Sequence, residues 1–281
     1  MTIEERRSLT HGEFWIPENE RVAYQEALRA LNRAGVPFVV SGLYAIYEYT
    51  GIYRQTKDLD LFFEPERVVP AARVLRDAGF HVHVEQPHWL AKAVKGEALV
   101  DLIYGMGNGL AFIDEAWYRH ARTGVLAAEP VRIAPPEELI WHRLFVSERH
   151  RYDMADIVHL ILARGDELNW ERLVRRVGEH WRLLLAQIHL FDYVYPGHRK
   201  RIPEWIRQDL MERAYEELGA TGDPGICNGP MISRFSFNID VNEWKFEDPR
   251  AATIAAACRT PVVEQIVSSD VWQERQTSHA A

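Results

Sequence analysis

Three aspartates in otherwise apolar segments are the residues of this sequence best suited to chemistry. Asp58 and Asp60 alternate with leucines in the segment Asp58–Phe62, DLDLF, and the apolar residues predict a strand. Because side chains in a strand alternate between two faces, both carboxylates are expected on one face and close together. Two carboxylates at such a distance repel each other unless a proton or a cation lies between them. A divalent cation with oxygen ligands, Mg²⁺ first, is the simplest such partner.

Asp101 is the third acid, and it lies in the strand-like segment 98–104. Val100 and Leu102 face one side of that strand, and Asp101 faces the other. If this strand lies beside DLDLF, three carboxylates share one surface. Such a set can hold two divalent cations about 3.5–4 Å apart, an arrangement used for in-line displacement at phosphorus. Asp101 would then ligate the second cation or take the proton of the attacking hydroxyl.

The residues around the acids favour a site over the alternative, a solvated strand face or a turn. The acids lie in a run that is apolar enough to be buried, where unpaired charge is costly. Ser41 and Gly42, at a strand end that opens a helix, are candidates for phosphate binding through backbone N–H groups. Arg54 and Thr56 lie just before the acids and could contact nucleotide phosphates or orient the carboxylates.

The elements that position these residues are predicted as an α/β (α+β) domain with a mixed sheet flanked by helices, followed by a helical domain. Hydrophobic spacing and Gly/Pro punctuation predict these boundaries. In the first domain, strands are predicted over 38–41, 58–63, 80–85, 89–94, 98–104 and 130–133, and helices over 18–34, 43–50, 65–78 and near 114–121. Further helices are predicted over 136–149, 152–164, 169–178, 180–195 and 203–219. The expected domains are a core at 1–134, a helical domain at 135–220 and an extended C-terminal tail at 221–281 that packs on the body.

Composition narrows the class of protein. The chain has 281 residues, 47% hydrophobic and 26% charged, which is ordinary for a globular protein with ample core. The formal net charge of −8 argues against a surface coated in basic groups and mildly disfavours a large RNA substrate. Cys227 and Cys258 lack metal-ligand spacing and are expected as free thiols in a reducing cytosol. Without an apolar signal region or a run approaching ~18 apolar residues, a cytoplasmic protein that does not cross a membrane is expected.

The stretch VSGLYA, five residues, then GIYRQTKDLDLFF resembles the signature of the polymerase-beta-like nucleotidyltransferase superfamily. It is most similar to the bacterial branch of AbiEii/AbiGii-type toxin nucleotidyltransferases. The positions that match are Ser41, Gly42, Gly51, Arg54, Thr56, Asp58 and Asp60, with Asp101 as the later single acid. In the helical part, Arg143, Arg149, Asp153 and Asp156 match a basic residue, an arginine and a D-x-x-D helix of that branch, with His142 as an alternative match for the basic residue.

The resemblance implies a nucleotidyltransferase-type mixed sheet, Mg²⁺ (two ions) and an NTP as co-substrate. It implies transfer of a nucleoside monophosphate to an acceptor hydroxyl, with release of pyrophosphate. Asp58, Asp60 and Asp101 would be the catalytic and metal-binding residues. The nucleotide would be bound by Ser41, Gly42, Arg54, Thr56 and Arg143. A small molecule, a tRNA end and a protein hydroxyl are all compatible acceptors.

Two other functions stay open at this point. The first is a binding or regulatory protein on the same fold, toxin-antitoxin-like, with the acids retained but no productive acceptor. The second is a metal-dependent phosphodiesterase, since the same carboxylates could position water. Elsewhere, His81, His83 and Glu85 alternate along a predicted strand. They could ligate a metal, but the solvent-exposed face of an edge strand is the favoured interpretation.

Overall fold

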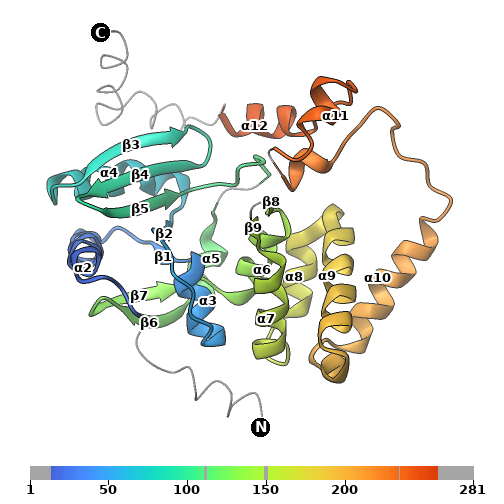
Figure 1. Cartoon of the computed structure of the whole chain (residues 1–281), viewed down its shortest axis with the longest axis horizontal. Coiled ribbons are helices and arrows are strands. Elements are labelled where there is room, and N and C mark those ends of the chain that lie inside the picture. Colours follow the sequence, from blue (N-terminus) through green and yellow to red (C-terminus); the bar gives the residue numbers. More distant parts are fainter. Residues whose placement is uncertain (1–13, 111–112, 149–150, 234, 259–281) are drawn as a thin grey trace. The chain divides into compact units, whose positions relative to one another are not determined.

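The computed structural model describes residues 14–110, 113–148, 151–233 and 235–258, and these fall into two compact units. The sheet unit contains the described residues of 14–48, 52–135 and 250–258. The helical unit contains the described residues of 49–51 and 136–249 (Figure 1). Residues 221–249 of the segment expected as a tail therefore group with the helical unit, and residues 250–258 group with the sheet unit.

A seven-stranded mixed sheet forms the centre of the sheet unit, in the order β3-β4-β5-β2-β1-β7-β6. The strands are β1 (Val39–Val40), β2 (Leu59–Phe62), β3 (His81–Gln86), β4 (Leu90–Lys95), β5 (Ala98–Ile103), β6 (Arg122–Leu126) and β7 (Glu129–Ile133). The β2 strand pairs in parallel with β5, and β1 pairs antiparallel with β2 and in parallel with β7. The expected α/β fold with a mixed sheet flanked by helices is confirmed.

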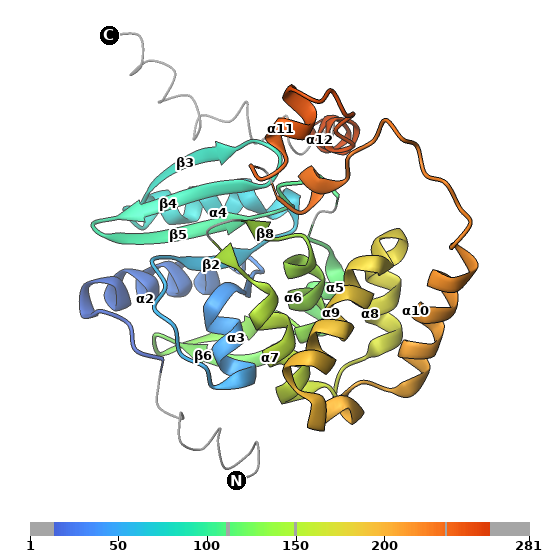
Figure 2. The same cartoon turned by 45° about the vertical axis from the view of Figure 1, so that its right-hand side comes forward.

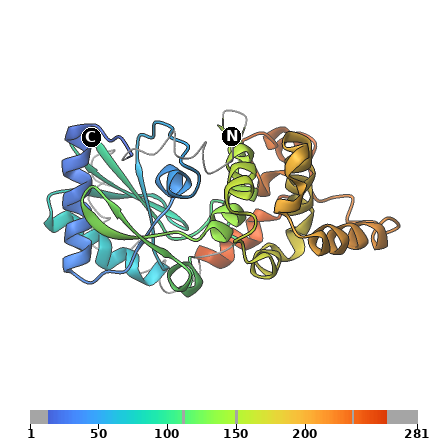
Figure 3. The same cartoon turned by 90° about the horizontal axis from the view of Figure 1, so that it is seen from below.

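The helices of the sheet unit are α2 (Glu18–Arg33), α3 (Gly42–Thr50, with its last two residues in the helical unit), α4 (Pro65–Asp77), α5 (Glu115–Arg119) and α12 (Arg250–Cys258). The α2 and α4 helices contact each other and also contact strands of the sheet; Figure 3 shows them in dark blue and cyan. Pro65 begins α4, where its fixed φ suits a helix start. Gly35 follows α2 with φ +66°, a left-handed conformation that favours glycine.

We call the face of the sheet that α2 and α4 cover the core face. Tyr24, Leu28 and Leu31 of α2 are buried, as are Leu75 of α4 and Val100 of β5. Lys95 of β4 belongs to this face, because its ammonium donates to Glu26 of α2 and to the carbonyl of Ala78 just after α4. Since side chains alternate along a strand, Lys92 projects from the opposite face of β4.

The helical unit contains α6 (Pro136–Leu144), α7 (Met154–Arg164), α8 (Trp170–Val177), α9 (Trp181–Val194), α10 (Glu204–Glu216) and α11 (Asn238–Asn242), with a short hairpin of β8 (Ser147–Glu148) and β9 (Arg151–Tyr152). Its described residues also form the 3₁₀ turns η1 (Gly178–His180), η2 (Pro196–Arg201) and η3 (Gly229–Met231). Figure 2 shows α6, α7, α8 and α9 packed beside one another. Their apolar faces supply its core, which includes Leu139, Ile161, Leu173, Leu184 and Phe191.

Two elements of the structure differ from the prediction. The helix predicted over 136–149 ends at Leu144, because the N–H of Ser147 donates to the carbonyl of Ile232 and residues 147–148 pair with β9. The β6 strand was not predicted, since it is mostly exposed and depends on its pairing with β7. Among the helices of the described residues, none is long and apolar enough to span a membrane.

Candidate active site

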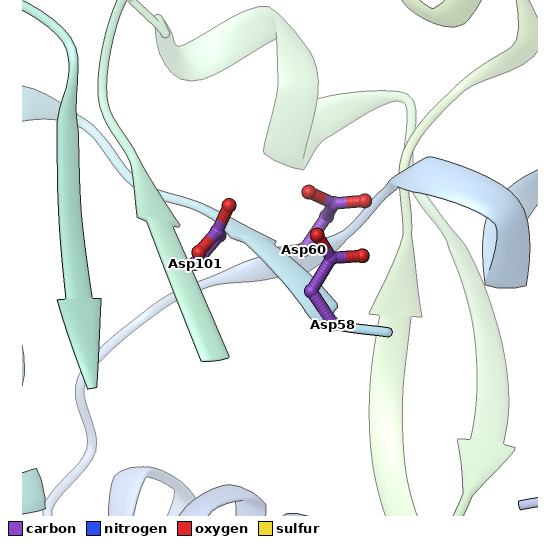
Figure 4. A group of neighbouring side chains, drawn as sticks. All are labelled: Asp58, Asp60 and Asp101. Atoms are coloured by element: carbon purple, nitrogen blue, oxygen red, sulfur yellow. The ribbon is translucent and has the colours of Figure 1, made fainter. Parts of the chain in front are cut away.

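The carboxylates of Asp58, Asp60 and Asp101 form one cluster. One oxygen of each lies within 4.8 Å of an oxygen of the other two. Figure 4 shows the three side chains on the same side of β2 and β5, with Asp58 just before β2, Asp60 within β2 and Asp101 on β5. Asp101 is buried, while Asp58 and Asp60 are half-buried. The predicted proximity of the three acids is confirmed.

Strand register brings the third acid to the other two. In the parallel pairing of β2 with β5, Asp60 lies directly opposite Asp101, and Leu61 lies opposite Leu102. Neighbouring strands lie about 4.8 Å apart, so side chains opposite each other on one face are in contact range. Asp58 lies two residues before Asp60, which returns its carboxylate to the same face.

Thr56 orients Asp58. Its hydroxyl donates to Oδ1 of Asp58 over 2.7 Å, and the same hydroxyl oxygen lies 3.2 Å from the carbonyl oxygen of Asp58. A hydrogen bond to the charged carboxylate is stronger than one between neutral groups. Of the two expected roles of Thr56, contact with phosphate and orientation of the acids, the structure displays the second.

Ser41 and Gly42 fix the position of Asp60. The N–H of Ser41 donates to the carbonyl of Asp60 over 3.0 Å. Gly42 begins α3 with φ +61°, and a Cβ built there would lie 1.8 Å from Oδ2 of Asp60. No L side chain fits in that space, so the glycine leaves a cradle that the carboxylate of Asp60 fills.

Lys92 joins the cluster from β4, opposite Asp101 in the antiparallel pairing of β4 with β5. Its ammonium donates to Oδ1 of Asp101 over 2.8 Å. Burial raises the pKa of the Asp101 carboxyl, and the charges of Asp58 and Glu85 raise it further. The hydrogen bond and the charge of Lys92 act in the other direction and lower that pKa. Lys92 thus favours the charged form of Asp101 beside groups of like charge.

The two arginines expected to bind nucleotide lie in different units. Arg54 is half-buried in the segment between α3 and β2 of the sheet unit, four residues before Asp58. Arg143 lies in α6 of the helical unit. There its guanidinium Nε donates to Oδ2 of Asp156 over 3.1 Å, and both side chains are buried. The expectation that Arg143 contacts phosphate stays a prediction.

The cluster has the chemistry of a divalent cation site. Its donors are carboxylate oxygens, the ligands that Mg²⁺ prefers. Three carboxylates this close repel each other without a cation among them, and the cradle at Gly42 holds one of them in place. The residues therefore fit Mg²⁺. Within the part of the chain that the structure describes, this cluster is the one group of three acids, histidines or cysteines close enough to hold a metal ion.

Two features of the site go beyond the sequence prediction. The sequence does not single out Lys92, because it does not reveal which face of β4 meets the acids; the register of β4 with β5 decides it. The sequence pattern predicts phosphate binding at Gly42, and the structure places the carboxylate of Asp60 there. The left-handed φ of Gly42 suits either role, and the binding of phosphate at Ser41 and Gly42 stays a prediction.

Comparison with known proteins identifies one family. The sequence model of a family described as uncharacterised nucleotidyltransferases matches residues 18–190, more than half of the chain. The match includes all three acids, Lys92 and Arg143. No curated protein matches the sequence significantly.

Several solved structures are similar to this chain. The solution structure of the antibiotic-resistance factor ANT(2'')-Ia is 23% identical, with a TM-score of 0.44, and the match covers 62% of this chain and 98% of that one. JHP933 from Helicobacter pylori is 14% identical, with a TM-score of 0.39, covering 72% of this chain and 97% of that one. The lincosamide antibiotic adenylyltransferase LnuA, bound to lincomycin, is 16% identical, with a TM-score of 0.37, and the match covers 52% of this chain and 96% of that one.

Proposed function

Because the chain belongs to the family of uncharacterised nucleotidyltransferases, we propose that it transfers a nucleoside monophosphate from an NTP to an acceptor hydroxyl. In this reaction the acceptor oxygen forms a bond to the α-phosphorus, the bond to the β-phosphate oxygen breaks, and pyrophosphate leaves. The observation that carries the proposal is the cluster of Asp58, Asp60 and Asp101, whose oxygens lie within 4.8 Å of one another.

The proposed cofactor is Mg²⁺, as two ions held by the three aspartates. When bound, such ions neutralise the triphosphate and favour the ionised form of the attacking hydroxyl. The protein's part is to hold the ligands. Thr56 fixes the orientation of Asp58, and the backbone of Ser41 with the space at Gly42 fixes Asp60. Each acid thus has its own support.

Asp101 is the proposed base. The acceptor hydroxyl must lose a proton as its oxygen bonds to phosphorus, and a carboxylate within the cluster can take it. Lys92 bonds to Oδ1 of Asp101 and favours the charged form of the carboxylate, against the effect of its burial on the pKa. Its partner offsets part of the cost of burying that charge.

The basic residues have separate proposed roles. Arg54 precedes the acids on the same connection and is proposed to contact the phosphates of the NTP, as a guanidinium does well. Arg143 is proposed for the same contact through the resemblance to the toxin-type branch. Such a contact requires Arg143 to loosen its bond to Asp156 or to extend its remaining nitrogens beyond it.

The acceptor class is open among small molecules, tRNA ends and protein hydroxyls. The more specific assignment to the AbiEii/AbiGii-type branch rests on the sequence motifs around Thr56, Asp58 and Asp156. A non-catalytic protein of the toxin-antitoxin kind on the same fold is the outcome to distinguish from transfer.

Calorimetric titration of each NTP, first with Mg²⁺ and then with EDTA, tests the proposal. The wild type is expected to bind at least one of the NTPs with micromolar affinity, and only when Mg²⁺ is present. The double variant Asp58→Asn/Asp60→Asn is expected to lose that binding. Asp77→Asn removes a charge of the same sign from the exposed end of α4 and should bind like the wild type. The bound NTP, labelled at the α-phosphate, then identifies the acceptor by label transfer. Failure of every NTP to bind would support the non-catalytic protein.

A further inference from the structure

The ion pair of Lys92 with Asp101 lies on the face of the sheet that carries the acidic cluster, of which Asp101 is a member. The ammonium lies 2.8 Å from Oδ1 of Asp101, and the two side chains are 22% and 11% exposed. Asp101 lies opposite Lys92 on one neighbouring strand and opposite Asp60 on the other, so the three residues form a row across β4, β5 and β2. A cation of the protein therefore already occupies a position beside one of the three proposed metal ligands.

The second lysine of β4 shows that this placement is specific to one face. Lys95 lies three residues further along the strand and projects from the core face, where it donates to Glu26 and to the carbonyl of Ala78. The two ammonium groups carry the same charge on the same strand, but of the two it is Lys92 that bonds to a member of the cluster. Lys95 is thus a natural control for the charge of Lys92.

A cross-strand pair of opposite charges is common and stabilises a sheet slightly. This pair differs because its acid belongs to a cluster that needs cations. An ammonium and a divalent cation that share one carboxylate repel each other, and the repulsion is strong where water is partly excluded. The Thr56 hydroxyl, which orients Asp58, is neutral and creates no such conflict with a cation.

We propose that the ammonium of Lys92 compensates the charge of Asp101 and thereby controls the binding of a second divalent cation. This inference rests on the proposed metal-dependent function. In the absence of NTP, Lys92 compensates Asp101, and one divalent cation binds at Asp58 and Asp60. The triphosphate brings the negative charge that allows the second cation and the ammonium to lie in the same site. The cluster thus assembles in an order, with the second cation arriving together with the triphosphate.

Binding of Mn²⁺, followed by the electron paramagnetic resonance signal of the free ion, tests the order without measuring activity. The wild type is expected to bind one Mn²⁺ alone and two in the presence of inorganic triphosphate. Lys92→Gln keeps a hydrogen-bond donor and removes the charge. It is expected to bind the second Mn²⁺ without triphosphate, at least about tenfold more tightly than the wild type, the lower end of the effects known for groups next to metal ligands. Lys95→Met should bind like the wild type.

The outcomes separate this inference from the proposed function. If Lys92→Gln binds the second Mn²⁺ no more tightly than Lys95→Met while the wild type still binds one, Lys92 is a structural partner and the inference is wrong. If neither the wild type nor any variant binds Mn²⁺, the cluster is not a cation site, and the metal-dependent function fails with it. Lys92→Met, which also removes the hydrogen bond, checks that the charge decides: it should resemble Lys92→Gln, and weaker binding of the first ion than in the wild type would contradict the proposal. Circular dichroism confirms that each variant is folded.

Discussion

Replacing Gly42 by alanine should disable the site without removing any of its functional groups. Gly42 begins α3, and the Cβ of an alanine there would lie 1.8 Å from Oδ2 and 2.7 Å from Cγ of Asp60. The three carboxylates, Thr56 and Lys92 all remain in this variant. Any loss of function would therefore come from the position of one carboxylate.

The size of the effect follows from the distances. Real Cβ atoms are essentially never closer than 3.0 Å to another heavy atom, so Oδ2 of Asp60 must retreat by about 1.2 Å from its present 1.8 Å. Distances from ligand to metal are tolerated only within about 0.2 Å, so Asp60 would be lost as a ligand in its present geometry. A misplacement of about 1 Å costs about a hundredfold in rate. The left-handed φ of +61° adds about 1–2 kcal/mol of strain for a residue with a Cβ.

Gly35 provides the matched control. It has φ +66°, and a Cβ there would meet nothing within 4 Å. Gly35→Ala therefore carries the backbone strain of Gly42→Ala without the clash. Both variants are expected to unfold at a lower temperature than the wild type, measured by circular dichroism.

The assay is Mn²⁺ binding, followed by NMP transfer once the acceptor is known. Gly42→Ala should bind Mn²⁺ at least about tenfold more weakly than Gly35→Ala and should transfer about a hundredfold more slowly. If Gly42→Ala binds Mn²⁺ like Gly35→Ala, Asp60 is not a metal ligand or is not held by this cradle. Either explanation would refute the proposed role of Gly42 in the site.

Two further predictions concern Thr56 and Glu138. Thr56→Val removes the hydrogen bond to Asp58 and should weaken Mn²⁺ binding about tenfold, whereas Thr56→Ser should keep it; equal binding by both variants would mean that Thr56 does not orient the acid. Burial raises the pKa of Glu138 in α6 from 4.5 to about 7, although Arg172 and Arg176 oppose the shift. Because the folded state binds this proton more tightly than the unfolded state, the free energy of unfolding is about 3 kcal/mol higher below pH 4.5 than above pH 7. This extra stability is lost as the pH rises from 4.5 through about 7. Glu138→Gln should remove that pH dependence from the free energy of unfolding measured in urea, and a wild-type profile that this substitution leaves unchanged would show that Glu138 is not its source.

The acids were predictable because their signal is local. Alternation within DLDLF places Asp58 and Asp60 on one face, and the same rule applied to 98–104 isolates Asp101 from its apolar neighbours. The prediction that the two strands are neighbours needed the resemblance to a known fold or the structure itself. Pairing of β2 with β5 spans a crossover that includes α4 and two other strands, and no short-range pattern specifies it.

The features that were not predicted depend on contacts between distant residues. The end of α6 at Leu144 depends on the bond of Ser147 to Ile232, which lies far along the chain. Periodicity favours continuing that helix, and tertiary pairing overrides it. The segment of β6, RTGVL, has little apolar pattern, because it is an edge strand with most of its side chains exposed.

The supports of the acids explain why the site needs two different kinds of neighbour. The Thr56 hydroxyl and the Ser41 N–H are neutral groups, and they fix the positions of Asp58 and Asp60. Asp101 is more buried, so an uncompensated charge there would cost more, and Lys92 supplies the compensation. The ammonium of Lys92 also lowers the attraction of Asp101 for a divalent cation, because the two cations would repel each other across one carboxylate. If the proposed two cations bind, the unequal supports of chemically identical side chains set the order of their binding, which the sequence, with three aspartates in two apolar strands, does not reveal.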